Sequence, residues 1–288
     1  MIDIYYPSKS FFISTAKVWY EYLLNGFKKI GNVHISEELS KKSFSKLNKQ
    51  ITAININNKM IWYDWCDFRK VHLEIKSKND YYFKIMLLEG YQYIKNIFPI
   101  GQTVSSMEYF NIIDKLPKNI NNYKYDVFFN GRVTNYALRT KAVELIKSDT
   151  RINSNVGLRK FLTGSKRPDF SSSLETNRLS YYDFILETLN SKLNLALPGV
   201  GEDWTWRHME ILGLGKCLIM PKPYCILPNN PKDIYIQVHR DLKDLNDKII
   251  YFSKHDKERE EIAKRGKEYF YKYLTPEGQA KWILEKIL

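Results

Sequence analysis

The chain has 288 residues, 44% of them hydrophobic and 15% aromatic, which excludes an intrinsically disordered protein and allows one large domain or two smaller ones. Its net charge of +13 is compatible with anionic partners such as nucleic acid, phosphorylated substrates or a membrane surface, and equally with a composition generally rich in lysine. No apolar run reaches the ~20 residues that cross a bilayer, and the N-terminus has no signal-peptide pattern. We therefore expect a cytoplasmic protein, with peripheral contact to the inner membrane face as an option.

The first half of the chain predicts short strands around one long helix. The helix is expected at Ala16–Phe27, ended by Gly26 and Gly31. A polar, proline-marked stretch at 114–125 predicts a boundary between domains 1–118 and 119–288. Strands are expected at Ile2–Tyr6, Val33–Ile35, Ile51–Ile56, Met60–Tyr63, Tyr81–Leu87 and Ile97–Ile100.

The second half alternates strands with helices. Strands are expected at Asp126–Phe129, Arg151–Val156, Leu193–Leu197, Cys217–Met220 and Ile234–Val238. Helices are expected at Tyr136–Ile146, Tyr181–Leu189, Trp206–Leu214, Leu242–Phe252, Lys257–Tyr273 and Pro276–Leu288. Ser180 precedes the second of these helices, with Asp183 at the capping-box spacing. This alternation predicts a parallel sheet with helices on both faces.

The segment 193–221 carries the most specific pattern in the sequence. A buried strand leads through a glycine-containing loop into a helix, and a second buried strand follows Gly215. A strand, a glycine loop and a helix in this order place the helix N-terminal amides against a phosphate group. Glu202 and Glu210 have seven residues between them, and Arg207 lies one turn before Glu210 in the helix.

At these residues the chain resembles the GT-B superfamily of nucleotide-sugar-dependent glycosyltransferases. In that family, two glutamates at this separation precede a run of small residues, a glycine and an apolar strand, here Ile211–Gly215 and Cys217–Met220. The resemblance covers roughly 125–288. It implies an α/β fold of two Rossmann-like domains that face a cleft, the C-terminal one with a parallel sheet flanked by helices. It also implies a last helix that packs back on the acceptor-side N-terminal domain, and a UDP- or GDP-sugar as donor with no cofactor and no metal.

The resemblance also implies roles for particular residues. Glu210 would hold the ribose hydroxyls of the nucleotide, and Glu202 would lie near the transferred sugar. After Glu202 the family has glycine-aromatic-glycine, whereas this chain has Asp203-Trp204-Thr205. Arg132 and Lys141 match the glycine-arginine and the later lysine that neutralise the diphosphate. The donor-binding loop would include Gly199 and Gly201.

Each of these cations also has an ordinary structural interpretation. Arg207 either pairs with Glu210 on one helical face or binds phosphate oxygens as a bidentate donor. Arg132 could be a solvated loop residue, and Arg139 and Lys141 could form a solvated helix face. The loop residues Lys166, Arg167 and Arg178 could contact an anion, although a solvated loop is the simpler interpretation.

An inverting transferase needs a general base for the acceptor hydroxyl, whereas a retaining one does not. Asp64 and Asp67, which follow a predicted strand, are the candidates, ahead of His34 and His72. The cysteines show no C-x-x-C spacing, so neither a metal site nor a disulfide is expected.

We therefore predict a metal-independent glycosyltransferase that transfers a sugar to a glycan or lipid-linked acceptor in bacterial surface glycan synthesis. Two alternatives stay open. One is a phage-type transferase that acts on modified bases of DNA, where positive charge would follow the phosphate backbone. The other is a nucleotide-sugar or nucleic-acid-binding protein without turnover, because fold does not fix activity.

Overall fold

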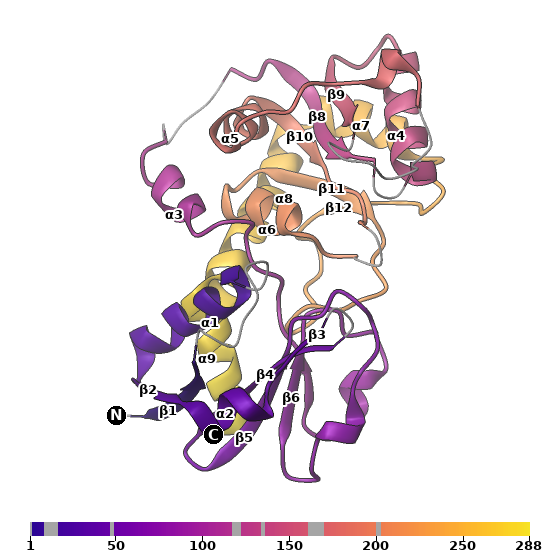
Figure 1. The fold of residues 1–288 in the computed structure, drawn as a ribbon. Helices are drawn as coiled ribbons and strands as arrows, with labels where there is room; N and C mark the ends of the chain where they lie inside the picture. The colour runs from indigo at the N-terminus through magenta and orange to yellow at the C-terminus, as the bar shows by residue number, and fades with distance from the viewer. Residues whose placement is uncertain are drawn as a thin grey trace.

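The computed structural model describes residues 2–8, 17–46, 49–116, 122–133, 136–160, 170–199 and 203–288. Two β-sheets, one in each half of the chain, organise the structure (Figure 1). The N-terminal sheet has the order β2-β1-β4-β5-β6-β7, with β3 paired to β4. Its strands are β1 (Asp3–Pro7), β2 (Asn32–Ser36), β3 (Phe44–Lys46), β4 (Lys49–Ile56), β5 (Lys59–Asp64), β6 (Tyr81–Lys84) and β7 (Ile97–Pro99).

The N-terminal sheet is mixed, which corrects the expectation of a purely Rossmann-like first half. β1 pairs with β2, β5 with β6 and β6 with β7 in parallel, but β4 runs antiparallel to β1, β3 and β5. The tight turn at Asn57 and Asn58 explains the β4–β5 hairpin, because both residues have positive φ, 48° and 62°. Two such residues form the type I′ turn that joins adjacent antiparallel strands.

The C-terminal sheet is entirely parallel, as predicted, and has the order β12-β11-β10-β8-β9. The chain places β9 on one side of β8 and β10 on the other, so the strand order reverses between β8 and β10. In open α/β sheets, ligands bind at such a reversal, beyond the carboxyl ends of the strands. The strands are β8 (Tyr125–Arg132), β9 (Ser154–Arg159), β10 (Ser191–Leu195), β11 (Cys217–Pro221) and β12 (Ile236–Val238).

Helices cover both faces of the C-terminal sheet. Alternate strand residues separate two cores: Val127 packs with α4 and α7, whereas Phe128 packs with α5 and α6. The predicted cap of α5 is confirmed, because the Ser180 hydroxyl accepts a hydrogen bond from the Asp183 amide. These helices are α4 (Tyr136–Ser148), α5 (Tyr181–Leu189), α6 (Trp206–Gly213), α7 (Leu245–Lys254) and α8 (Asp256–Tyr269).

The chain ends with α9 (Pro276–Ile287), which follows a π-helical turn at Phe270–Leu274 and packs against α1 (Lys17–Ile30). The sequence predicted that Gly26 would help to end α1, but α1 continues through it. A Cβ atom at Gly26 would lie 1.9 Å from the carbonyl oxygen of Pro276, so glycine is needed there for close helix packing. The shorter helices are α2 (Glu37–Lys42) and α3 (Glu108–Ile113), with 3-10 turns at Leu73–Ile75, Tyr91–Tyr93 and Ser172–Leu174. Among the described residues, no helix is both long and apolar enough to cross a membrane.

Candidate active site

A cavity of about 620 Å³ opens at the carboxyl ends of β8, β9 and β10, where the strand order reverses. Both halves of the chain line it: Asp67 and Ser105 come from the first half, and Glu210 comes from α6 in the second. Most of its charged groups are arginines. They are Arg132, Arg139, Arg159, Arg178 and Arg207.

Glu210 lies at this cavity although only 3% of its surface is exposed. Its Oε1 atom accepts three hydrogen bonds, from the Ser105 amide at 2.9 Å, the Ser105 hydroxyl at 2.5 Å and the Tyr181 hydroxyl at 2.7 Å. Burial raises the pKa of Glu210, and these hydrogen bonds from Ser105 and Tyr181 oppose the shift. In the part of the chain that the structure describes, Oε2 receives no hydrogen bond, so this oxygen is available to a ligand hydroxyl.

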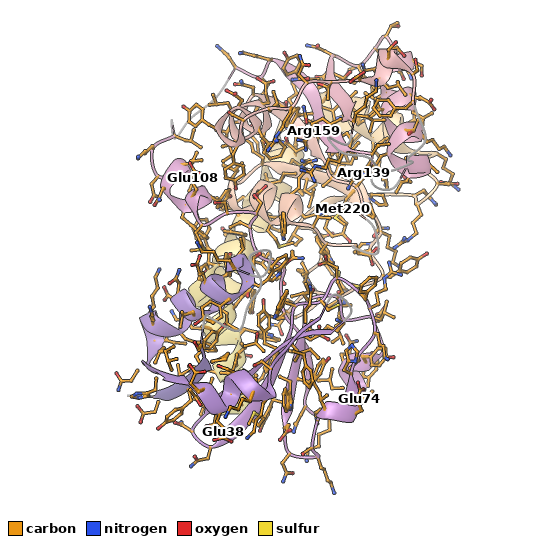
Figure 2. All side chains as sticks on the ribbon, in the orientation of Figure 1. Glu38, Glu74, Glu108, Arg139, Arg159 and Met220 are labelled. Carbon is orange, nitrogen blue, oxygen red and sulfur yellow. The ribbon has the colours of Figure 1, made fainter. Side chains whose placement is uncertain are left out.

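Arg139 holds the loops around the cavity together. Its guanidinium donates to the carbonyl oxygens of Arg132 at 2.6 Å, Leu197 at 2.9 Å and Pro198 at 3.2 Å. These carbonyls belong to the end of β8 and to the segment after β10. Arg139 therefore connects the loops on the two sides of the strand reversal while it adds positive charge to the site. Figure 2 labels Arg139 and Arg159 in the C-terminal half.

Arg207 and Arg159 bring desolvated positive charge to the cavity. The Nε atom of each is buried and has no hydrogen-bond partner among the described residues. Arg207 lies over the ring of Phe184, with its Cζ atom 4.6 Å from the ring centroid. Burial, and next the charge of Arg139, lower the pKa of Arg207 to about 9. Burial also lowers the pKa of Arg159, helped by Arg132 and Arg178. Each of these arginines disfavours the protonated, charged form of its neighbours. An anion in the cavity would therefore stabilise the charged form of every arginine around it.

The predicted catalytic carboxylates have three different outcomes. Asp67 lines the cavity. Asp64 does not, because it is fully buried and pairs with Lys84, with 3.0 Å between Oδ2 and Nζ. Its other oxygen accepts a hydrogen bond from the Cys66 amide, so Asp64 lies in the core and away from the cavity. Glu202 lies outside the described residues.

The predicted donor-binding residues separate in a similar way. Arg132, Gly199, Arg207 and Glu210 all line the cavity. Lys141 does not, because it lies just over half a turn from Arg139 on α4 and donates instead to the carbonyl oxygen of Asp241.

Gly201, Lys166 and Arg167 lie outside the described residues, and Arg178 lines the cavity. An ion pair between Arg207 and Glu210, one of the two predicted arrangements, does not form. The side chain of Arg207 lies over Phe184, and Glu210 takes neutral donors instead.

Sequence reasoning missed Ser105, Tyr181 and Arg159. Tyr181 is the first residue of a correctly predicted helix, so its position at the carboxyl end of the sheet could have been inferred. Arg159 ends β9, which begins three residues later than predicted because Asp149 and Arg151 form a hydrogen-bonded turn. Ser105 lies in an irregular segment far from Glu210 in sequence, and no local pattern indicates their contact.

The start of α6 is fixed by a buried histidine and a buried aspartate. His208 accepts the amide of Thr205 on its Nδ1 atom at 2.9 Å, which completes a capping box. Asp203 accepts the amides of Tyr224 and Cys225 and forms an ion pair with Arg69 at 3.3 Å. The loop before α6 is therefore tied to the first half of the chain.

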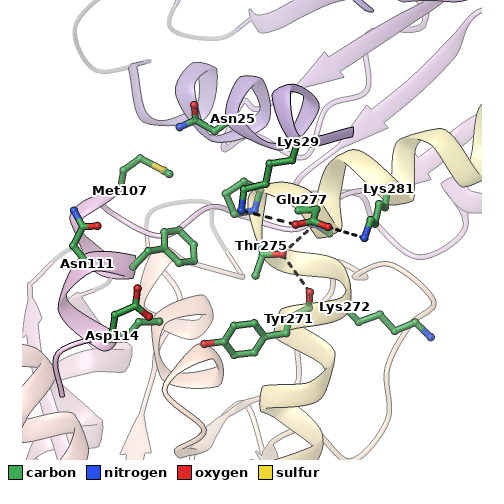
Figure 3. A pocket seen from close by; sticks show the side chains of 14 residues that line it. Asn25, Lys29, Met107, Asn111, Asp114, Tyr271, Lys272, Thr275, Glu277 and Lys281 are labelled. Atoms are coloured by element: carbon green, nitrogen blue, oxygen red, sulfur yellow. Dashed lines mark hydrogen bonds and ion pairs between the residues drawn. The ribbon is translucent and has the colours of Figure 1, made fainter. Parts of the chain in front are cut away.

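Another hollow, of about 850 Å³, lies away from this cavity. It lies where α1, α3, the π-helical turn and α9 meet, and Figure 3 shows Glu277 there between Lys29 and Lys281. This hollow has neither a parallel-strand edge nor a cluster of unpaired cations. Among the described residues, no group of three or more His, Cys, Asp or Glu side chains could hold a metal ion. Cys66, Cys217 and Cys225 are buried and are not joined by disulfides.

The chain matches one protein family over part of its length and is distantly similar to solved structures. Among curated proteins, none matches this chain. The crystal structure of TarM is similar at 13% identity and a TM-score of 0.42, over 73% of this chain and 51% of that one. The N-terminal domain of trehalose-6-phosphate phosphatase from Candida albicans is similar at 10% identity and a TM-score of 0.41, over 67% and 50%. The chain thus spans about half the length of these two structures. Residues 153–285, which include α6 and Glu210, match the protein family described as glycosyl transferase-like.

Proposed function

We propose that the protein transfers a sugar from a nucleotide-sugar donor to an acceptor hydroxyl, with the donor bound in the cavity at the strand reversal. One observation carries this proposal: a buried carboxylate, Glu210, keeps one oxygen available beside a group of arginines. In the proposed complex, Oε2 of Glu210 accepts hydrogen bonds from the ribose hydroxyls. The family match over 153–285 supports the same chemistry.

The arginines supply the charge that the leaving diphosphate needs. A guanidinium can donate two parallel hydrogen bonds to phosphate oxygens, and such charge-assisted bonds are about twice as strong as neutral ones. Arg132, Arg159, Arg178 and Arg207 line the cavity. We propose that they stabilise the diphosphate without a divalent ion, as preorganised cations in a partly desolvated site.

Asp67 is the proposed general base, because it faces the cavity from the other half of the chain. The acceptor oxygen forms a bond to the anomeric carbon while the bond from that carbon to the diphosphate oxygen breaks. Asp67 takes the acceptor proton, and the nucleoside diphosphate leaves with the bonding electrons. We propose that the acceptor, a glycan or lipid-linked molecule, binds between the two halves before this step, in a GT-B-like arrangement.

The test is transfer or hydrolysis with a panel of UDP-, GDP- and CMP-sugars. Glu210→Gln should weaken nucleotide binding 10- to 100-fold, since a hydrogen bond to a charged group contributes about 1.5–3 kcal/mol. Gln can still accept the Ser105 and Tyr181 hydrogen bonds, so the fold is kept. Asp67→Asn should lower kcat by about 100-fold or more with little change in nucleotide affinity.

Glu261→Gln, at an exposed position of α8, is the matched control and should behave as wild type. Nucleotide binding without turnover of any donor would instead identify a binding protein. If no nucleotide binds, the proposal fails. Transfer to modified DNA that weakens steeply with salt would favour the DNA-modifying alternative over a glycan acceptor.

A further inference from the structure

A second cationic cavity lies at the opposite end of the C-terminal sheet. It has a volume of about 780 Å³ and is bordered by the first residues of β10 and β11 and by one face of α8. Its acidic lining residues are Asp114 and Glu260. Its cationic lining residues are Lys192, Lys216, Arg259, Lys264 and Lys267.

Two of these cations share one aromatic ring. The Nζ atom of Lys216 lies 4.7 Å from the centroid of Tyr123, and the Cζ atom of Arg259 lies 5.4 Å from it. Lys216 has no ion-pair partner among the described residues. Burial, and next the charge of Arg259, lower the pKa of Lys216 to about 8. The cation–π contacts with Tyr123 offset part of the repulsion between Lys216 and Arg259. A bound anion would offset that repulsion directly.

Arg259 has an unsatisfied donor at this cavity. Only 2% of its surface is exposed. Its Nη1 atom donates to the carbonyl oxygen of Phe252 at 2.8 Å and to Asp256 at 2.6 Å, whereas its buried Nη2 atom has no partner in the described part of the chain. A buried charged donor without an acceptor is unfavourable, so the native arrangement is incomplete without one.

Lys267 lines the same cavity. Gly215 has a φ of +66°, and a Cβ atom there would lie 2.8 Å from Cδ of Lys267. The absence of a side chain at Gly215 therefore lets the stem of Lys267 lie against Gly215, the residue before Lys216. Lys192, in contrast, is already compensated by Asp126 at 2.9 Å.

We propose that this cavity is a second anion site, which binds a phosphate group through Nη2 of Arg259 and the ammonium groups of Lys216 and Lys267. It is separate from the proposed donor cavity, because the two lie at opposite ends of the same parallel strands. Leu116 and Leu189 also line it, which suits a phosphate ester with an apolar part. A soluble phosphate ester and a lipid headgroup both carry the phosphate group that these cations would bind.

The experiment measures acetylation of individual lysines by mass spectrometry at pH 8 in the full chain. Lys216 should react faster than the exposed Lys257, because a lower pKa leaves more of its amine neutral. Inorganic phosphate, compared with chloride at equal ionic strength, should slow acetylation of Lys216 at least fivefold and leave Lys257 unchanged. Protection by free phosphate would indicate a soluble ligand.

A second arm replaces phosphate with vesicles of phosphatidylglycerol in phosphatidylcholine, against phosphatidylcholine alone. Protection by these vesicles only would indicate a lipid headgroup. Lys267→Gln should reduce the protection in whichever arm shows it, whereas Lys257→Gln should not. The proposal is overturned if neither anion protects Lys216, or if Lys257 is protected equally.

Discussion

Asp64 in the N-terminal sheet and Glu210 in the C-terminal half are both buried carboxylates that the sequence marked as candidates. Asp64 faces a buried lysine, Lys84, and has no access to solvent. Glu210 faces hydroxyl and amide donors, while Arg159 and Arg207 at the same cavity form no ion pair with a carboxylate of the described residues. The first arrangement neutralises itself, whereas the second is completed by a ligand that brings negative charge and hydroxyl groups.

The groups around a buried acid distinguish a structural acid from a functional one. A buried ion pair balances its charges within the protein, so nothing is left to bind. A buried carboxylate held only by neutral donors has no ion-pair partner, so its second oxygen remains available to a ligand, which is typical of a binding site. Substitutions at Lys84, His208 and Arg132 test this distinction, with expected effects that decrease in that order.

The largest effect is expected for Lys84→Met. Removing one partner of a buried ion pair leaves Asp64 charged in the core and should lower the free energy of unfolding by about 3–5 kcal/mol. Urea denaturation measures this loss. The double variant Lys84→Met with Asp64→Asn should recover much of the stability, and its nucleotide affinity should equal that of wild type. A loss below about 1 kcal/mol in the single variant would show that the pair is not structural.

The sequence predicted the C-terminal half better than the N-terminal half. Strands such as Cys217–Met220 are continuous apolar runs, and helices such as Tyr181–Leu189 carry their own caps, so local signals sufficed. In the N-terminal half the sequence predicted most of the strands, but the pairing of strands depends on the turns between them. The antiparallel hairpin at Asn57 and Asn58 was not predicted.

The site was predictable only where its residues follow one another along the chain. Glu210 and Arg207 share a helix with a recognisable motif, and Arg132 ends a predicted strand. Ser105 reaches Glu210 across a separation of more than a hundred residues. Lys141 had the right spacing in sequence, but it lies on the face of α4 away from the cavity. It follows Arg139 by two residues, and a step of two residues turns a helix by about 200°.

The second prediction concerns His208, a buried residue of α6. It tests the role of this histidine in capping the helix, independently of the binding site that Glu210 forms on the same helix. Burial lowers the pKa of His208 to about 3, below its ordinary value of 6.5. His208 therefore contributes stability that is fully present above pH 6.5 and is lost as the pH falls from 6.5 towards 3. The slope for one proton is about 1.4 kcal/mol per pH unit, so about 2 kcal/mol is lost between pH 6.5 and 5.

His208→Gln should remove this part of the pH dependence, because a glutamine at the same position of the capping box can still accept the Thr205 amide. Urea unfolding at pH 7 and pH 5 measures the difference. His239→Gln, at an exposed position, is the control and should retain the wild-type response. An unchanged pH response in His208→Gln would mean that another group carries it.

The smallest effect concerns two cations that the sequence treated alike. Arg132 lines the cavity, and Lys141 donates to a backbone carbonyl outside it. Arg132→Gln should weaken the binding of UDP or GDP about tenfold, or about 1.4 kcal/mol, because one guanidinium no longer contacts the diphosphate. Lys141→Gln should change the affinity less than twofold. Isothermal titration at low salt compares the two, since exposed charges are screened as salt increases. Equal weakening in both variants would mean that the overall charge of the chain, rather than the geometry of this cavity, attracts the nucleotide.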